Sequence, residues 1–283
     1  MTVVVAIIAP GAMGAGVGKR LTSHGVRVLT ALAGRSEATA ARAREAGMAA
    51  AGDEEIAAAD FILSILPPGD ALALAQRFAP ILVASNAKPV YVDCNAVNPA
   101  TVERVAAAIA PTGCSFVDAG IIGAPPKGND AGPRFYGSGA AAPRFAALRQ
   151  YGLDVRVLEG PPSAASALKM SYAGITKGTQ AIGAAMMLAA MRAGSAAALF
   201  DELSFSQKEM LAQFKQQLPM MPAKAYRWVA EMREIAGFVG DDPAAHELYE
   251  GAAHFYERIA EDFSADQKAV AAIKDFLAKA SSV

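Results

Sequence analysis

Residues 164–178 read AASALKMSYAGITKG, and the character of the chain changes at this stretch. Short apolar runs alternate with helical patterns before it, whereas only helical patterns follow it. At helical spacing, Lys169 shares one face with Tyr172 and Thr176. We therefore expect the start of a long interdomain helix whose polar face, with Lys169, lines a cleft between two domains. The alternative is a packing helix whose lone lysine extends to solvent.

The pattern upstream of this stretch predicts a doubly wound parallel sheet. Val3–Ile8 is short, apolar and β-branched, which suits a central strand buried on both faces. Further runs of strand length are found at residues 26–32, 60–66, 89–93, 114–118, 134–138 and 155–158. Helical patterns lie between most of them, and this alternation predicts an α/β, Rossmann-type domain. We place that domain at residues 1–161, with a Gly- and Pro-rich loop over residues 120–133.

The pattern downstream predicts an all-α domain at residues 162–283. Its first helix covers about residues 163–193, and shorter helices are expected at 195–204, 207–217, 222–238, 243–263 and 266–279. Residues 181–191 are apolar on nearly every face of the long helix, so this half must be buried. The later helices are too few to enclose it. We therefore expect a two-fold homodimer in which the helical domains pack together and close each other's clefts; the alternative is a monomer whose own helices cover the segment.

Composition excludes several classes of protein. A net charge of −1 and a pI near 6.3 argue against a nucleic-acid or anionic-membrane partner. Two cysteines and three histidines leave little material for a metal site or a disulfide framework. The chain has no apolar run of the roughly 20 residues that a membrane span requires, and its start has no basic segment typical of a signal peptide. We expect a cytoplasmic protein that acts on a small-molecule substrate.

The first strand leads into Ala9-Pro10-Gly11-Ala12-Met13-Gly14, which nearly matches G-x-G-x-x-G. In that motif Gly11 lets the backbone approach a pyrophosphate, and Gly14 lets the following helix pack closely on the sheet. The helix N-terminus offers N–H groups to the phosphates. Ala9 replaces the first glycine, and alanine resists the positive φ of a tight turn. The cofactor contacts predicted here are Pro10, Gly11, Ala12 and Met13.

The end of the second strand indicates which cofactor is bound. NAD-specific folds place Asp or Glu about 20 residues past the loop, to bind the ribose 2′-hydroxyl. This chain has Gly34-Arg35-Ser36 there and no acid. Arg35 can form two hydrogen bonds with a 2′-phosphate, and the Ser36 hydroxyl adds a third. We therefore predict NADP. Ser36 is also expected to cap the next helix, and the alternative for Arg35 is a solvated residue opening that helix.

The segment Ala167–Gly178 resembles the β-hydroxyacid dehydrogenase superfamily, which includes 6-phosphogluconate dehydrogenase, and the resemblance covers most of the chain. Within the superfamily it is similar to a subgroup of unassigned function with a shortened 6-phosphogluconate-dehydrogenase-like C-terminal domain. The resemblance implies that Lys169 is a general acid/base beside the nicotinamide. It also implies cofactor contacts from Leu66-Pro67-Pro68 and from Asn95.

Two departures from the family pattern concern the substrate side. The asparagine that follows the lysine by four residues is Ala173 here, so Tyr172 or Thr176 would have to replace it. The substrate motif Asp-Ala-Pro-Val-Ser-Gly-Gly reads DAGIIGA at residues 118–124. Ile122 thus replaces a serine that binds a substrate carboxylate, which argues against a simple small hydroxyacid. The substrate-binding residues we expect are Ile122, Gly123, Tyr172 and Thr176.

These features predict an NADP-dependent oxidoreductase that moves a hydride between nicotinamide and a hydroxy or keto compound, with Lys169 handling the proton. One alternative is an imine reductase, a neighbouring branch that commonly replaces the lysine with Asp or Tyr; Lys169 speaks against it and Ile122 for it. Another is an NADPH-binding regulator without turnover, since the asparagine partner is missing. Trp228, near Lys224 and Arg227, either covers the cleft or packs in the core. The substrate and the direction of reaction stay open.

Overall fold

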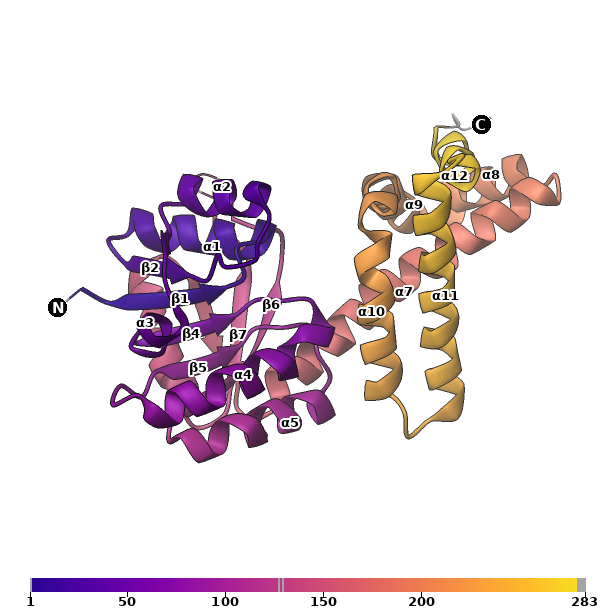
Figure 1. Cartoon of the computed structure of the whole chain (residues 1–283). Helices are drawn as coiled ribbons and strands as arrows, with labels where there is room; N and C mark the ends of the chain where they lie inside the picture. Colours follow the sequence, from indigo (N-terminus) through magenta and orange to yellow (C-terminus); the bar gives the residue numbers. More distant parts are fainter. Residues whose placement is uncertain (1, 127, 129, 279–283) are drawn as a thin grey trace. The chain divides into compact units, whose positions relative to one another are not determined.

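The computed structural model describes residues 2–126, 128 and 130–278, and it divides into two compact units. The sheet unit is Met1–Met170 and the helical unit is Ser171–Val283 (Figure 1). The change from one unit to the other falls within a single long helix. The domain boundary expected between residues 161 and 162 lies just before that helix and stays a prediction.

The sheet unit contains the predicted doubly wound sheet. Its eight strands are β1 (Val4–Ile8), β2 (Arg27–Thr30), β3 (Ala49–Ala50), β4 (Phe61–Ser64), β5 (Val90–Asp93), β6 (Ser115–Ile122), β7 (Arg134–Ser138) and β8 (Asp154–Val157). Their order is β3-β2-β1-β4-β5-β6-β7-β8, and all neighbours are parallel except β6 and β7. The order reverses between β1 and β4. In such sheets, ligands bind at the carboxyl ends of the strands on either side of that reversal.

Helices cover both faces of the sheet (Figure 1). They are α1 (Ala12–Ser23), α2 (Glu37–Glu45), α3 (Asp53–Ala57), α4 (Ala71–Ala84), α5 (Pro99–Ile109) and α6 (Ala142–Phe145), with 3₁₀ turns η1 (Pro68–Asp70), η2 (Ala110–Thr112) and η3 (Ala146–Tyr151). Alternation along β1 explains the layers. Val5 and Ile7 point into the core that includes Leu21 of α1, while Ala6 and Ile8 point into the core that includes Phe78 of α4.

The structure corrects the sequence reading at two places. Strand β3 and helix α3 were not expected, because two and five residues are too short to show a period. Strand β6 extends to Ile122, past the expected end at residue 118 and into the predicted loop. The extension follows from antiparallel pairing with β7, in register from Asp118 opposite Ser138 to Ile122 opposite Arg134.

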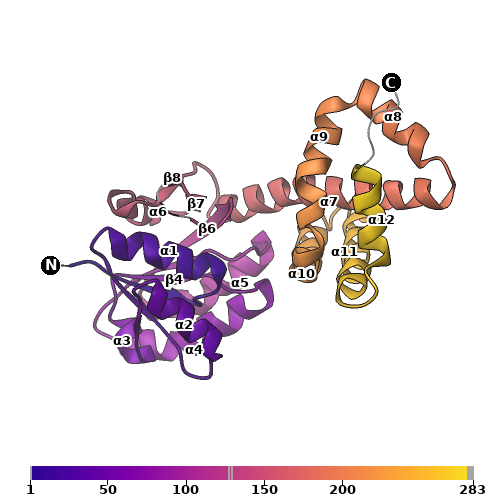
Figure 2. The same cartoon turned by 90° about the horizontal axis from the view of Figure 1, so that it is seen from above.

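The predicted long helix is α7, Ala164–Arg192, which begins in the sheet unit and ends in the helical unit. The helical unit continues with α8 (Ala196–Ser206), α9 (Lys208–Gln217), η4 (Leu218–Met220), α10 (Pro222–Phe238), α11 (Pro243–Ser264) and α12 (Lys268–Leu277). Helices α10 and α11 pack side by side (Figure 2). Of the helices in the described part of the chain, none is long and apolar enough to span a membrane.

Close approach of two helices depends on Gly183 of α7. A Cβ at this position would lie 2.5 Å from Cζ of the Phe214 ring on α9. Real Cβ atoms do not come this close to a neighbour, so any larger residue must displace the buried Phe214 ring. The glycine therefore sets how closely α9 packs on α7.

Gly183→Ala is expected to lower the free energy of unfolding of the helical unit by about 1–3 kcal/mol, the usual cost of overpacking, although alanine favours helix. In a Phe214→Leu background the same change should cost clearly less, because the clashing ring is gone. Urea unfolding of the four variants measures this coupling. Equal costs in both backgrounds would contradict the contact.

Candidate active site

The loop between β1 and α1 leaves the start of α1 without a cap from any described side chain. Gly11 is the N-cap residue of α1, and the first turn carries no acidic residue. The Gly11 N–H donates to the Ala9 carbonyl at 2.9 Å, which closes the turn. The N–H groups of the first turn of α1 therefore face the position where a phosphate would lie.

The glycines of this loop differ in what surrounds them. A Cβ on Gly11 would meet no atom within 4 Å, so the space above it is open to a ligand. A Cβ on Gly14 would lie 2.1 Å from the Ala9 carbonyl oxygen, so this position admits only glycine. Among described residues other than glycine, only Gln267 has a positive φ. Ala9 therefore does not have to adopt the left-handed backbone conformation that alanine resists.

The β2–α2 turn contains the residues expected at a 2′-phosphate. Gly34 has φ +71°, which favours glycine, and Arg35 is exposed. Ser36 caps α2 as predicted, accepting a hydrogen bond from the Thr39 N–H at 3.3 Å. Sequence reasoning missed Arg42. Its guanidinium donates to Thr39 Oγ1 at 2.9 Å and lies 3.5 Å from the Pro10 carbonyl oxygen, so it sits between this turn and the phosphate loop.

A row of buried polar residues crosses four neighbouring strands at the level where β4 and β5 end. The strand register aligns Ser64 of β4, Asp93 of β5, Asp118 of β6 and Ser138 of β7. All four are at most 1% exposed. Ser138 bonds to Asp118, while Ser64 and Asp93 both bond to Asn95; hydrogen bonds of this kind offset the cost of burying polar side chains. The row marks the edge of the sheet where the chemistry is expected.

Asn95, which the family resemblance placed near the nicotinamide, belongs to this row's hydrogen-bond network. Its Oδ1 accepts from the Leu66 N–H at 2.5 Å, and its Nδ2 donates to Ser64 Oγ at 2.8 Å and to an Asp93 carboxylate oxygen. The side chain is 2% exposed. Asn95 therefore fixes the start of the Leu66-Pro67-Pro68 segment, and its direct contact with a cofactor stays a prediction.

Asp118 anchors the first turn of α7. Its two carboxylate oxygens accept from the Ser166 hydroxyl at 2.6 Å and the Ser166 N–H at 2.8 Å. Ser138 Oγ lies 3.1 Å from the same carboxylate and accepts from the Ala165 N–H. Burial raises the pKa of Asp118, while the hydrogen bonds from Ser166 and Ser138 oppose that rise. The carboxylate also stands at the positive end of the helix dipole.

Lys169 follows this anchor by one helical turn. A Cβ on Gly120 of β6 would lie 3.1 Å from Cβ of Lys169 and 2.9 Å from the Ala165 carbonyl oxygen, so the glycine lets α7 lie directly on the strand. The Lys169 ammonium donates to the Ile121 carbonyl oxygen at 2.8 Å. Ala173, at the family's asparagine position, is buried and has no polar side chain. Lys169 is therefore bonded to a backbone carbonyl. Because every residue has a backbone carbonyl, this contact could not be predicted from the residue types in the sequence.

The remaining predicted residues are divided between the units. Ile122 ends β6, and Gly123, with φ +131°, packs against Pro133; both directly follow the carbonyl that Lys169 contacts. Tyr172 and Thr176 lie on the next turns of α7, in the helical unit, where Thr176 Oγ1 bonds the Tyr172 carbonyl at 2.8 Å. No residue type or bond within the described chain assigns these four to a substrate, and their roles stay predictions.

Trp228 packs inside the helical unit. Its ring meets the Tyr256 ring edge-on, with centroids 5.2 Å apart, and the Lys177 ammonium lies 5.1 Å from the Trp228 ring centroid. Lys177 is also paired with Glu231 of α10. These contacts tie α7, α10 and α11 together, and they favour the packing interpretation of Trp228. Within the described residues, no group of three His, Cys, Asp or Glu side chains could hold a metal ion.

The fold and the loop are those of the NAD(P)-binding domains found in dehydrogenases. The family described as the NAD binding domain of 6-phosphogluconate dehydrogenase matches residues 4–150, more than half of the chain. The chain therefore belongs to this family. A domain of unknown function, DUF1932, matches residues 190–259, within the helical unit. A search of curated protein sequences found no significant match.

Solved structures with this fold include hydroxyacid dehydrogenases and imine reductases. A conserved protein of unknown function, described as structurally similar to 3-hydroxyacid dehydrogenases, is 27% identical over 96% of this chain and 99% of its own, with a TM-score of 0.70. The 3-hydroxyisobutyrate dehydrogenase of Mycobacterium tuberculosis, solved with L-serine, is 21% identical over 97% and 99%, TM-score 0.69. An imine reductase from Myxococcus stipitatus with NADP⁺ is 17% identical over 97% and 99%, TM-score 0.54.

The raised pKa of Asp118 predicts a pH-dependent difference between the wild type and Asp118→Asn. A carboxyl group whose pKa is higher in the folded state stabilises the fold below its unfolded pKa of about 3.9, and this contribution is lost as the pH rises through the folded value. The free energy of unfolding of the wild type should therefore fall relative to that of the variant across this range.

Urea unfolding in buffers from acid to neutral pH measures the difference. Asp275→Asn, at an exposed position on α12, controls for the general effect of removing a carboxylate. If the wild type instead became more stable relative to Asp118→Asn as the pH rises, the pKa of Asp118 would not be raised in the folded state.

Proposed function

We propose that the protein is an NADP-dependent oxidoreductase that transfers a hydride between nicotinamide and a hydroxy or keto substrate, with Lys169 as the general acid/base. The observation that carries this proposal is the Lys169 ammonium bonded to the Ile121 carbonyl at the carboxyl edge of a nucleotide-binding sheet. A proton-transfer group gains most from a fixed position, and β6 fixes both the helix and the ammonium.

The residues of the chain fit the cofactor. The open space at Gly11 and the free start of α1 suit a pyrophosphate, and Arg35, Ser36 and Arg42 suit a 2′-phosphate. The Leu66-Pro67-Pro68 segment, held by Asn95, is suited to the ribose side. When bound, the nicotinamide gives or takes the hydride. Lys169 then gives a proton to, or takes one from, the substrate oxygen.

Reduction of an imine is the second candidate function. Ile122 offers an apolar surface beside Gly123 where the family pattern has a carboxylate-binding serine. An apolar wall suits a substrate without a carboxylate, and the fold is shared with imine reductases. In that reaction Lys169 would give its proton to nitrogen. A panel of keto acids, ketones and cyclic imines, followed by loss of NADPH absorbance, separates the two.

We also propose that the protein is a cytoplasmic homodimer. Cys94 and Cys114 are buried free thiols, which suits a reducing compartment. On α7, one face is buried through Ala184 and Met187, but Ile182 and Met186 on the other face are 53% and 57% exposed. The helical unit thus covers only part of a helix that is apolar all round, and a second copy would cover the rest.

Arg35→Asp tests the choice of cofactor. A charged, bidentate hydrogen bond is worth about 1.5–3 kcal/mol, so the variant should bind NADPH roughly 10- to 100-fold more weakly and NADH nearly unchanged. Fluorescence titration of both cofactors measures it. Arg44→Asp on the following helix α2, where Arg44 pairs with Glu37, is the matched control. Wild type that binds NADH as tightly as NADPH would refute the NADP assignment.

Lys169→Ala tests the proton-transfer role. Turnover with the substrate found by the panel should fall about 10²-fold or more, the scale of a general acid/base, while the dissociation constant for NADPH stays nearly unchanged. Lys268→Ala, at an exposed position on α12, is the control. Turnover within a few fold of wild type would remove Lys169 from the mechanism.

A further inference from the structure

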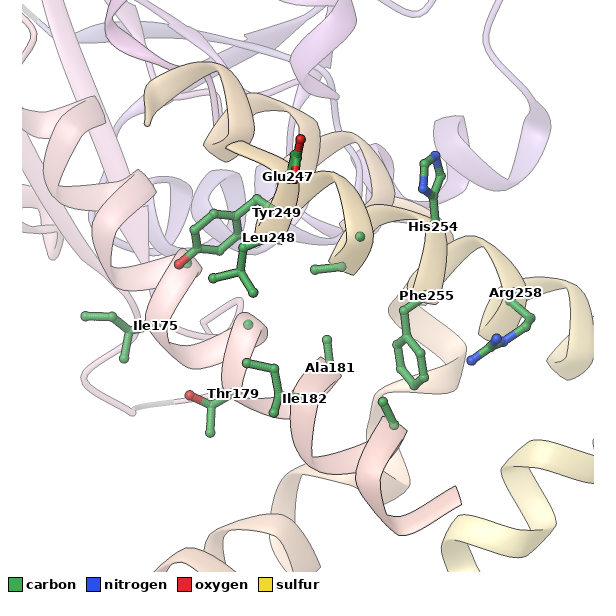
Figure 3. Close-up of a pocket in the computed structure, with 15 residues that line it drawn as sticks. Ile175, Thr179, Ala181, Ile182, Glu247, Leu248, Tyr249, His254, Phe255 and Arg258 are labelled. Carbon is green, nitrogen blue, oxygen red and sulfur yellow. The ribbon is translucent and has the colours of Figure 1, made fainter. Parts of the chain in front are cut away.

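One face of α11 forms a stripe of five exposed residues. Glu247, Leu248, Gly251, His254 and Arg258 are spaced so that they share one side of the helix, and all five are exposed. We call them the α11 stripe. With residues of α7 they line a groove of about 680 Å³ inside the helical unit (Figure 3).

Large aliphatic side chains stand open around this groove. Ile175 and Ile182 of α7 are 68% and 53% exposed, and Leu248 of α11 is 53% exposed. Single apolar side chains are commonly exposed on protein surfaces. Several exposed apolar side chains on one face are less common and are typical of a protein–protein contact.

The charges of the α11 stripe are arranged for self-pairing. Glu247 and Arg258 stand toward opposite ends of α11, with His254 between them (Figure 3). Eleven residues separate the two charges, about 16 Å along a helix. No ion pair joins either of them to another described residue of the chain. The Arg258 guanidinium lies over the Phe255 ring of its own helix, with Cζ 5.3 Å from the ring centroid, but each end of the stripe still carries a charge with no ion-pair partner among the described residues.

A two-fold axis across the middle of the stripe satisfies both charges at once. If α11 packs antiparallel on the same helix of a second copy, Glu247 lies opposite Arg258 of the partner subunit, and the reverse pair forms at the other end. The same register sets His254 opposite Gly251 of the partner subunit. A Cβ on Gly251 would meet no atom within 4 Å, so the glycine leaves room there for an imidazole ring.

We propose that the α11 stripe is the two-fold interface of the homodimer, with Glu247 and Arg258 forming reciprocal ion pairs and Ile175, Ile182 and Leu248 buried around them. The inference rests on the proposed homodimer and names its surface. An isologous contact needs a patch that is complementary to itself, and opposite charges at the two ends of an apolar groove meet that condition.

Charge reversal tests the pairing. Sedimentation at micromolar concentration should give the wild type twice the 29.1 kDa chain mass. Glu247→Arg and Arg258→Glu should each raise the dimer dissociation constant about tenfold or more, because each sets like charges opposite in both pairs. The double variant Glu247→Arg/Arg258→Glu rebuilds both pairs and should recover most of the wild-type affinity. Glu103→Arg, exposed on α5 of the sheet unit, is the matched control.

A second variant avoids any change of charge. Gly251→Leu fills the space reserved for the partner's His254 and should dissociate the dimer, while circular dichroism confirms that the helices are intact. A dimer that withstands both reversals and Gly251→Leu leaves the homodimer in place and overturns this interface. A double variant as weak as the single ones overturns the ion pairs. A wild-type mass of 29.1 kDa overturns the homodimer and the interface together.

Discussion

The proposed site depends on the hydrogen bonds between the buried Asp118 carboxylate of β6 and Ser166 in the first turn of α7. A carboxylate that is 1% exposed pays a large desolvation cost, and it is tolerated because Ser166 and Ser138 bond to it and a helix begins beside it. These bonds fix the first turn of α7 on β6. Gly120 then allows the next turn to lie against the strand, and Lys169 reaches the Ile121 carbonyl. The position of the ammonium thus follows from one strand and one helix start.

Several side chains at the carboxyl edge of the sheet act by holding other parts of the chain. Asn95 bonds to Ser64 at the end of β4, to Asp93 at the end of β5 and to the Leu66 N–H, so it holds the start of the segment that follows β4. Arg42 connects the β2–α2 turn with the carbonyl of Pro10. A dinucleotide is long and binds to several loops at once, so loops that are already fixed lose less entropy on binding. This pre-organisation is consistent with a protein whose cofactor supplies the chemistry.

The helical unit combines tight internal packing with an exposed apolar surface. The Phe214 ring packs against Gly183, and the Tyr249 ring packs against Gly174. A Cβ at Gly174 would lie 2.8 Å from the Tyr249 hydroxyl oxygen. Lys177, paired with Glu231, covers the face of Trp228. One side of α7 is thereby enclosed, and Ile175 and Ile182 on the other side stay open. A helix of this composition is stable in water only when its open side is small or is covered by a partner.

The sequence by itself determined the features that depend only on residues close together along the chain. Apolar runs and helical periods predicted nearly all helices and strands to within a few residues. The position of Ser36 just before a helix predicted its role as a cap. The loop motif predicted that Gly14 lies where only glycine fits. Only the tertiary structure decided the rest. Strand β6 reaches Ile122 because β7 pairs with it, and Asn95 is enclosed because two strands end beside it. The Ile121 carbonyl that bonds Lys169 is backbone, which every residue carries, so its role depends on what the fold brings near it and leaves no trace in the residue types.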